Sequence, residues 1–242
     1  MNIIKKIWLF LHKRYVNSKS HVFVSYILEK LKFEGFHISY SQFGEDLIME
    51  NYLRDIKNGF FVDVGCNRPI EGNNTFKFYL KGWSGINIDG NQKMIDAFNS
   101  VRAKDINLCE IVSNKVEKTK FFISNDDRVS SLSNDFIDEM DKSRSYDDGS
   151  WVMPKTLEEI LDNHLPKGKE ITVLNVDVEG HDMEVIKSNN FEKYSPLMIC
   201  IEDHNFNVST ITKNEICIFL QAQGYEIAGF SKPNIFFRKS TV

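Results

Sequence analysis

The hydrophobic and polar positions from residue 60 onward alternate between two kinds of segment. Short, nearly continuous apolar runs are typical of strands buried on both faces, and they are separated by stretches with apolar positions at helical spacing. The strand-like runs lie at residues 60–64, 85–89, 106–113, 118–124, 171–180, 196–203, 225–230 and 234–239. The helix-like stretches lie at residues 74–82, 91–101, 156–164, 181–190 and 212–224. This alternation predicts an α/β fold with a doubly wound, mostly parallel sheet whose last two strands pair in antiparallel fashion.

Two further helices are expected before the first strand, over residues 21–36 and 40–55. Ser41 is a candidate cap for the second helix, because Glu45 and Asp46 follow in the first turn, where negative charge suits the helix dipole. We therefore expect a basic, helical extension at residues 1–39 and a main domain at residues 40–242.

The extension has an unusual charge pattern, with its cations at Lys5, Lys6, Lys13, Arg14 and Lys19 and its apolar residues at Ile4, Ile7, Trp8, Leu11 and Tyr15. The apolar residues fall at helical spacing and the cations lie on other faces. One interpretation is a peripheral membrane helix at the inner face of the membrane. The other is a helix docked on its own domain or on the second subunit of a homodimer. The apolar centre is too short for a signal peptide.

The stretch from residue 125 to residue 150 interrupts the alternation, because it is acidic, polar and rich in serine. A helix is expected around residues 135–142, with loops on either side. The segment is either a lid over the substrate or a solvated insertion.

Composition narrows the class of protein. The chain has 242 residues, 42% of them hydrophobic and 26% charged, with a formal net charge of −4. This balance indicates an ordinary globular core and argues against nucleic acid as a partner. No apolar run approaches the roughly 20 residues of a membrane span. The four cysteines form no C-x-x-C pair, which favours reduced thiols in a cytoplasmic protein over a disulfide framework.

The turn after the first strand indicates what kind of cofactor is bound. A dinucleotide site would need G-x-G-x-x-G here, whereas this chain has Gly65 alone, with Asn67 at the next glycine position and Pro69 within the motif. A pyrophosphate cradle is therefore disfavoured, and a cofactor with an adenosine but no phosphate fits better. S-adenosylmethionine is such a molecule, and Asp63 would lie near its amino-acid end.

The ends of the next two strands complete this prediction. Asp89 ends the strand at 85–89, where a carboxylate can accept hydrogen bonds from both ribose hydroxyls. It is alternatively a helix cap before Asn91. Ser113 ends the following strand, where topology places the adenine ring.

Acidic residues gather at the end of the strand at 171–180. Alternation along a strand would put Asp177 and Glu179 on the same side, facing the ligand crevice, with His181 nearby. These residues suit either a general base with its orienting partner or a divalent metal site. In the second case Asp203 is a further candidate oxygen ligand, and the expected ion is magnesium. His204 ends the next strand and is the best neutral-pH base by its ordinary pKa.

Four segments together resemble the FkbM family of S-adenosylmethionine-dependent methyltransferases. They are SQFGED at 41–46, FVDVGCN at 61–67, NNTFKFYLKGWSGINID at 73–89 and VDVEGHDMEVIKS at 176–188. The family more often has Glu-Pro at Asp89-Gly90, Glu at Asp182 and Gly at Ser188. The resemblance implies a class I, Rossmann-like methyltransferase fold with a seven-stranded sheet. It also implies an active-site role for Asp177 and Glu179, and cofactor roles for Gln42, Asp63, Gly65, Asn74, Thr75 and Asp89.

The sequence therefore predicts an O-methyltransferase that acts on a sugar hydroxyl, in the synthesis of a surface glycan of the capsule or lipopolysaccharide type. The alternatives are a nicotinamide-dependent oxidoreductase on a similar sheet and a non-catalytic binding protein that retains the fold.

Overall fold

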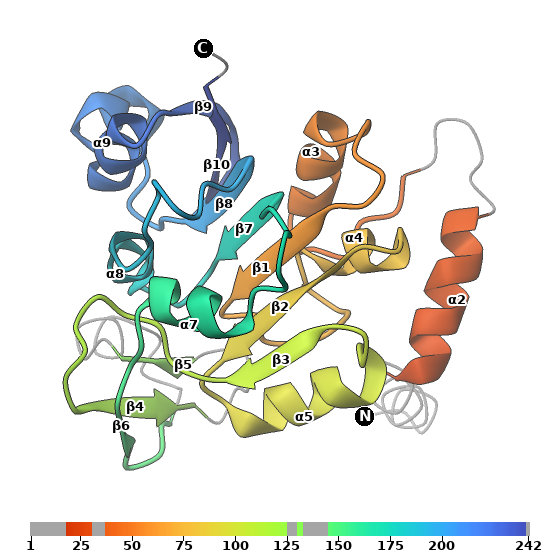
Figure 1. Ribbon diagram of the computed structural model, residues 1–242, viewed down its shortest axis with the longest axis horizontal. Coiled ribbons are helices and arrows are strands. Elements are labelled where there is room, and N and C mark those ends of the chain that lie inside the picture. The colour runs from red at the N-terminus through yellow and green to blue at the C-terminus, as the bar shows by residue number, and fades with distance from the viewer. Residues whose placement is uncertain (1–17, 31–36, 125–129, 133–144, 241–242) are drawn as a thin grey trace, which may run out of the picture.

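The computed structural model describes residues 18–30, 37–124, 130–132 and 145–240, and its centre is one seven-stranded sheet (Figure 1). The strand order is β3-β2-β1-β7-β8-β10-β9. The strands are β1 (Phe60–Val64), β2 (Ser84–Asp89), β3 (Ile106–Cys109), β7 (Val173–Val176), β8 (Met198–Glu202), β9 (Tyr225–Ser231) and β10 (Asn234–Lys239). The first five are parallel, and β10 runs antiparallel to both β8 and β9. The predicted mostly parallel sheet with an antiparallel end is confirmed.

Helices cover both faces of this sheet, as the apolar strands require. They are α2 (Lys19–Lys30), α3 (Glu45–Tyr52), α4 (Phe76–Leu80), α5 (Gln92–Val101), α7 (Leu157–His164), α8 (Asp182–Lys187), the 3-10 helix η1 (Val208–Lys213) and α9 (Glu215–Ala222). Alternate residues of β1 pack against the helices on the two opposite faces of the sheet. Phe60 and Val62 pack with α7, α8 and α9, whereas Phe61 packs with α3 and α4. The arrangement is doubly wound.

The path of the chain creates a crevice beside β1. From β1 the chain moves outward to β2 and β3, and it then returns to place β7 on the other side of β1. The strand order reverses at this point, and in open parallel sheets ligands bind where such a reversal occurs, at the carboxyl ends of the strands.

Several element boundaries differ from the sequence prediction. The helix expected at 40–55 begins at Glu45, and its N-cap is Gly44, at φ 87°, in place of Ser41. The strand expected at 106–113 ends at Cys109, and the strand expected at 171–180 ends at Val176. The expected helix at 135–142 lies outside the described residues.

A second, three-stranded sheet has the order β5-β4-β6 and consists of β4 (Thr119–Ile123), β5 (Ser130–Ser131) and β6 (Ser150–Val152). Its central strand was expected from the sequence, but its separation from the main sheet was not. In the part of the chain that the structure describes, no helix is both long and apolar enough to cross a membrane.

Candidate functional site

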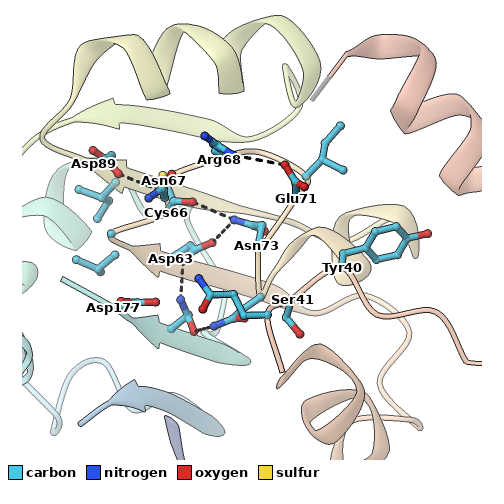
Figure 2. A pocket seen from close by; sticks show the side chains of 18 of the residues that line it. Tyr40, Ser41, Asp63, Cys66, Asn67, Arg68, Glu71, Asn73, Asp89 and Asp177 are labelled. Atoms are coloured by element: carbon cyan, nitrogen blue, oxygen red, sulfur yellow. Dashed lines mark hydrogen bonds and ion pairs between the residues drawn. The ribbon is translucent and has the colours of Figure 1, made fainter. Parts of the chain in front are cut away.

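A cavity of about 710 Å³ lies at the carboxyl ends of β1, β2 and β7, where the strand order reverses. Of the predicted site residues, it brings together Gln42, Asp63, Gly65, Asn74, Asp89, Asp177, Glu179 and His181. Figure 2 shows the side chains of Asp89, Asp63 and Asp177, which come from the ends of these neighbouring strands. Thr75, Ser113 and His204 are not among the lining residues.

Gly65 forms the turn that closes one wall of the cavity. It has φ 79°, and a Cβ added there would lie 1.8 Å from the carbonyl oxygen of Asp177. Its amide donates to the carbonyl oxygen of Ile88 at 2.9 Å. The turn is therefore wedged between the ends of β2 and β7, and only glycine fits there.

Asp89 is held rigidly at the tip of β2. Its Oδ2 accepts a hydrogen bond from the Asn67 amide at 2.9 Å, and its Oδ1 accepts one from the Asn91 amide at 2.8 Å. Burial raises its pKa to about 6, against the lowering effect of these two bonds. Asn91 is the N-cap of α5, because its own side chain accepts from the Lys93 amide. Asp89 therefore is not the cap, and its carboxylate oxygens keep lone pairs for a ligand in the cavity.

Asp63 forms the floor of the cavity, and its carboxylate accepts three hydrogen bonds from protein side chains. Its Oδ2 accepts from Thr75 Oγ1 at 2.7 Å and from Asn73 Nδ2 at 3.2 Å, and its Oδ1 accepts from Asn175 Nδ2 at 2.9 Å. Burial raises its pKa, although these bonds and the buried guanidinium of Arg102 act in the opposite direction. Asp63 is 1% exposed, so it acts on a ligand mainly through its charge.

Thr75 was expected to contact the cofactor, but the structure gives it a supporting position. It is fully buried, donates to Asp63, and accepts from Nη1 and Nη2 of Arg102, each at 3.2 Å. Asn74, in contrast, lines the cavity, and its Nδ2 donates to Asn175 Oδ1 at 3.0 Å. Nothing in the sequence pattern pointed to Arg102 or Asn175, because each is brought to Asp63 by tertiary packing.

Residues 38–42 form a second wall, which includes Gln42. Two buried acids at the start of α3 fix this segment. Asp46 accepts from the Tyr40 amide at 2.8 Å and from the hydroxyl of Ser41 at 2.9 Å, and Glu45 accepts from the Phe43 amide at 2.8 Å. The SQFGED motif therefore shapes the cavity wall, and within it the Ser41 hydroxyl is hydrogen-bonded to Asp46.

Asp177 and Glu179 lie in a turn beyond β7, not within a strand, so the argument from strand alternation was wrong for this pair. The turn still directs both toward the cavity. Asp182 holds it, because its Oδ1 accepts from the Val178 amide at 3.0 Å and its Oδ2 from the Gly180 amide at 3.2 Å. Glu179 has φ 55°, an uncommon left-handed conformation for a residue with a side chain.

The electrostatic environment of this turn disfavours ionised carboxylates. The pKa of Asp177 is raised well above its ordinary value, first by burial and then by the neighbouring carboxylates of Glu202 and Glu179. Burial likewise raises the pKa of Asp182 to about 8. A carboxylate with such a raised pKa is a stronger base than an ordinary aspartate.

His204 lies outside the cavity wall and forms ion pairs with carboxylates. Its Nε2 is 3.2 Å from Glu202 Oε2 and 3.9 Å from Glu179 Oε2. Hydrogen bonds to these two residues raise its pKa to about 10, so the ring is protonated at neutral pH. The structure therefore argues against the expectation that His204 is the neutral-pH base.

His181 and Ser113 contact each other at the side of the cavity. His181 Nε2 lies 3.0 Å from Ser113 Oγ, and burial lowers the pKa of His181. Ser113 itself is buried, whereas the neighbouring Ile111 and Val112 line the cavity together with Phe121. The predicted adenine end is thus apolar, and Ser113 reaches the cavity only through His181.

The cavity is strongly acidic. Among the described residues, its carboxylates are Asp63, Glu71, Asp89, Glu110, Asp177 and Glu179, against the single guanidinium of Arg68. Arg68 is in turn 3.4 Å from Glu71 (Figure 2). Such a lining attracts a cationic ligand and repels a pyrophosphate.

The model of the FkbM methyltransferase domain matches residues 63–227, which is more than half of the chain. The chain belongs to the FkbM methyltransferase family.

Comparison with solved structures gives a weaker result. A TehB-like SAM-dependent methyltransferase from Corynebacterium glutamicum is similar at 10% identity and a TM-score of 0.42, over 91% of this chain and 99% of that one. No curated protein matches the chain.

The residues of this FkbM-family site fit S-adenosylmethionine, the cofactor that membership implies. The acidic lining complements the sulfonium and ammonium charges of that molecule, which carries no phosphate. Asp89 would hold the ribose hydroxyls, and Ile111, Val112 and Phe121 would pack against the adenine. Gln42 and Asn74 offer amide groups at the other wall.

Among the described residues, one group of side chains offers metal-ligand atoms. Glu179, Glu202 and His204 each present an atom within 4.8 Å of the others. In this structure, however, His204 Nε2 forms ion pairs with both acids, at 3.2 Å from Glu202 Oε2 and 3.9 Å from Glu179 Oε2. Asp203, expected as a ligand, accepts instead from the Asn205 amide at 2.8 Å and from Asn214 Nδ2 at 2.5 Å. The geometry favours an ion-paired cluster over the predicted magnesium site.

Proposed function

We propose that this FkbM-family methyltransferase transfers the methyl group of S-adenosylmethionine to a hydroxyl oxygen of a sugar. The observation that carries the proposal is the position of Asp177, a carboxylate of raised pKa at the tip of β7, beside the turn that would hold the cofactor. A sugar hydroxyl is only weakly acidic, so methyl transfer to its oxygen benefits from a positioned base that removes the proton.

When bound, the cofactor supplies an electrophilic methyl group on its sulfonium. Asp177 in its ionised form would accept the hydroxyl proton, because burial and the neighbouring carboxylates raise its pKa and make it a stronger base than an ordinary aspartate. Glu179, held in the same turn, would accept a hydrogen bond from a neighbouring hydroxyl and so orient the ring. Orientation contributes as much as about 7–11 kcal/mol to such reactions, and a general base adds roughly 10²–10⁴-fold.

The acidic lining also supports the acceptor class. Carboxylates accept hydrogen bonds from several hydroxyls at once, which suits a polyol acceptor. Trp151 lies on β6 outside the cavity lining, with the amino groups of Lys118 and Lys120 over its ring, so it does not stack on a ligand in the cavity. A role in surface-glycan synthesis in the cytoplasm is part of this proposal.

The test is transfer of isotopically labelled methyl from S-adenosylmethionine to nucleotide sugars and glycan extracts. We expect labelled product from the wild type. Asp177→Asn should lose roughly 10²–10⁴-fold in rate while it still binds the cofactor. Asp55→Asn, the same substitution at an exposed residue after α3, is the matched control and should retain full activity.

The outcome also separates the proposal from its alternatives. Membership of a methyltransferase family favours methyl transfer over hydride transfer to a nicotinamide. Cofactor binding without transfer to any hydroxyl acceptor would support the non-catalytic alternative. Transfer that is unchanged in Asp177→Asn would refute the assigned base.

A further inference from the structure

Helix α2 is attached to the domain by its less apolar side. Ser25 is buried, Val22 packs against the cluster of Ile70, Phe76 and Leu80, and the Glu29 carboxylate lies 2.9 Å from Lys77 Nζ. Val22, Ser25 and Glu29 are spaced by three and four positions, so they share one face of the helix. This face anchors α2 beyond α4 and α5, on the outer side of the molecule (Figure 1).

Another side of α2 carries large apolar side chains in solvent. Phe23 is 66% exposed, Tyr26 44% and Ile27 39%. These three residues form a stripe at helical spacing, which we call the outer stripe, and Lys19 and Lys30 lie at its two ends. The amino group of Lys30 is 5.3 Å from the centre of the Tyr26 ring. An ordinary surface helix has the reverse pattern, with apolar residues toward the domain.

The charge of the N-terminal part of the sequence indicates which partner the outer stripe binds. Residues 1–30 contain the cations Lys5, Lys6, Lys13, Arg14, Lys19 and Lys30 and a single acid, Glu29, which is paired with Lys77. An apolar stripe flanked by cations is the pattern of a helix that lies in the interface of an anionic bilayer.

A second copy of the chain fits this face less well. Two copies would bring like charges together, and a specific dimer buries about 800 Å² on each partner, from about 20–30 residues. The described part of α2 exposes five large apolar side chains, those of the outer stripe and of Val24 and Leu28, which is far fewer than such an interface needs. We therefore propose that α2 docks on the surface of an anionic lipid bilayer through Phe23, Tyr26 and Ile27, with Lys19 and Lys30 at the headgroups.

The docking would place the reaction beside the membrane. Val24 and Leu28, on the next stripe of α2, line the cavity together with His21 and Ser25. The helix that contacts lipid would therefore also form a wall of the cavity, and an acceptor attached to a lipid would meet both. The proposal for lipid binding does not depend on the identity of the acceptor.

The test is co-flotation of the full-length protein with vesicles of phosphatidylcholine alone and of phosphatidylcholine mixed with phosphatidylglycerol. We expect binding to the mixed vesicles that weakens as salt is added. Phe23→Ser/Ile27→Ser should reduce the binding constant by about tenfold or more. Ile218→Ser/Phe230→Ser, which changes exposed apolar residues elsewhere, should bind like the wild type.

A charge-reversal pair tests the lysines separately. Lys19→Glu/Lys30→Glu should lose binding to the mixed vesicles, whereas Lys167→Glu/Lys169→Glu, at an exposed loop, should keep it. Cofactor binding and the melting temperature of each variant establish that it is folded. Two results would overturn the proposal. One is equal binding of the wild type and the Phe23→Ser/Ile27→Ser variant. The other is a wild-type dimer in solution that this variant dissociates.

Discussion

Replacing Asp89 by Asn changes the charge at the tip of β2 with almost no change in volume. In the wild type, each carboxylate oxygen accepts one backbone amide hydrogen, from Asn67 or from Asn91. In the variant, one of these amides would face an NH₂ group, so one protein hydrogen bond is lost. The ribose also loses a charged acceptor. A hydrogen bond to a charged group contributes about 1.5–3 kcal/mol, so the cofactor should bind about 10- to 150-fold more weakly.

Isothermal titration calorimetry with S-adenosylmethionine measures this change. Asp55→Asn is the control because it makes the same substitution at an exposed position. A melting temperature measured in parallel separates weakened binding from unfolding, because the lost backbone bond also destabilises the fold by about 1–3 kcal/mol. An Asp89→Asn protein that is folded and binds with wild-type affinity would refute the assignment of Asp89 to the ribose.

Three further results are expected. Gly65→Ala should abolish cofactor binding and lower the melting temperature, because its Cβ would lie 1.8 Å from the Asp177 carbonyl oxygen; wild-type melting and binding would contradict this. Burial raises the pKa of Asp89 to about 6, so the folded protein holds this proton more tightly than the unfolded chain does. The resulting contribution to the free energy of unfolding is fully present below the unfolded pKa, near 4, and is lost as the pH rises through 6. Cofactor affinity should rise over the same window as the carboxylate ionises, and calorimetry should find no such rise in Asp89→Asn. In rate measurements, kcat should increase with pH through the raised pKa of Asp177, while His204→Gln, which removes a protonated ring outside the cavity, should keep this profile. A profile that disappears in His204→Gln would restore that residue as the base.

The sequence identifies the fold because local signals agree with it. The apolar runs of β1 and β7 are too hydrophobic for a surface strand, and the helices between the strands have regular apolar spacing. Gly65 and Asp89 could be found for the same reason, since a glycine turn and an acid at strand ends are local features.

The remaining parts of the site depend on tertiary contacts. The pairing of Arg102 with Asp63 through Thr75 spans residues far apart in the chain. The ordinary pKa of His204 suggested a base, but the Glu179 and Glu202 carboxylates beside it raise that pKa and so change its protonation state. In the same way, the outer stripe of α2 shows its importance only once the structure establishes which side of the helix meets the domain.

The most direct test of the central claim is a crystal structure of the protein with S-adenosylhomocysteine, the product form of the cofactor. We predict that this ligand occupies the cavity, with both ribose hydroxyls against the Asp89 carboxylate and the adenine between Val112 and Phe121. Density for the ligand elsewhere, or a ribose that does not contact Asp89, would contradict the account.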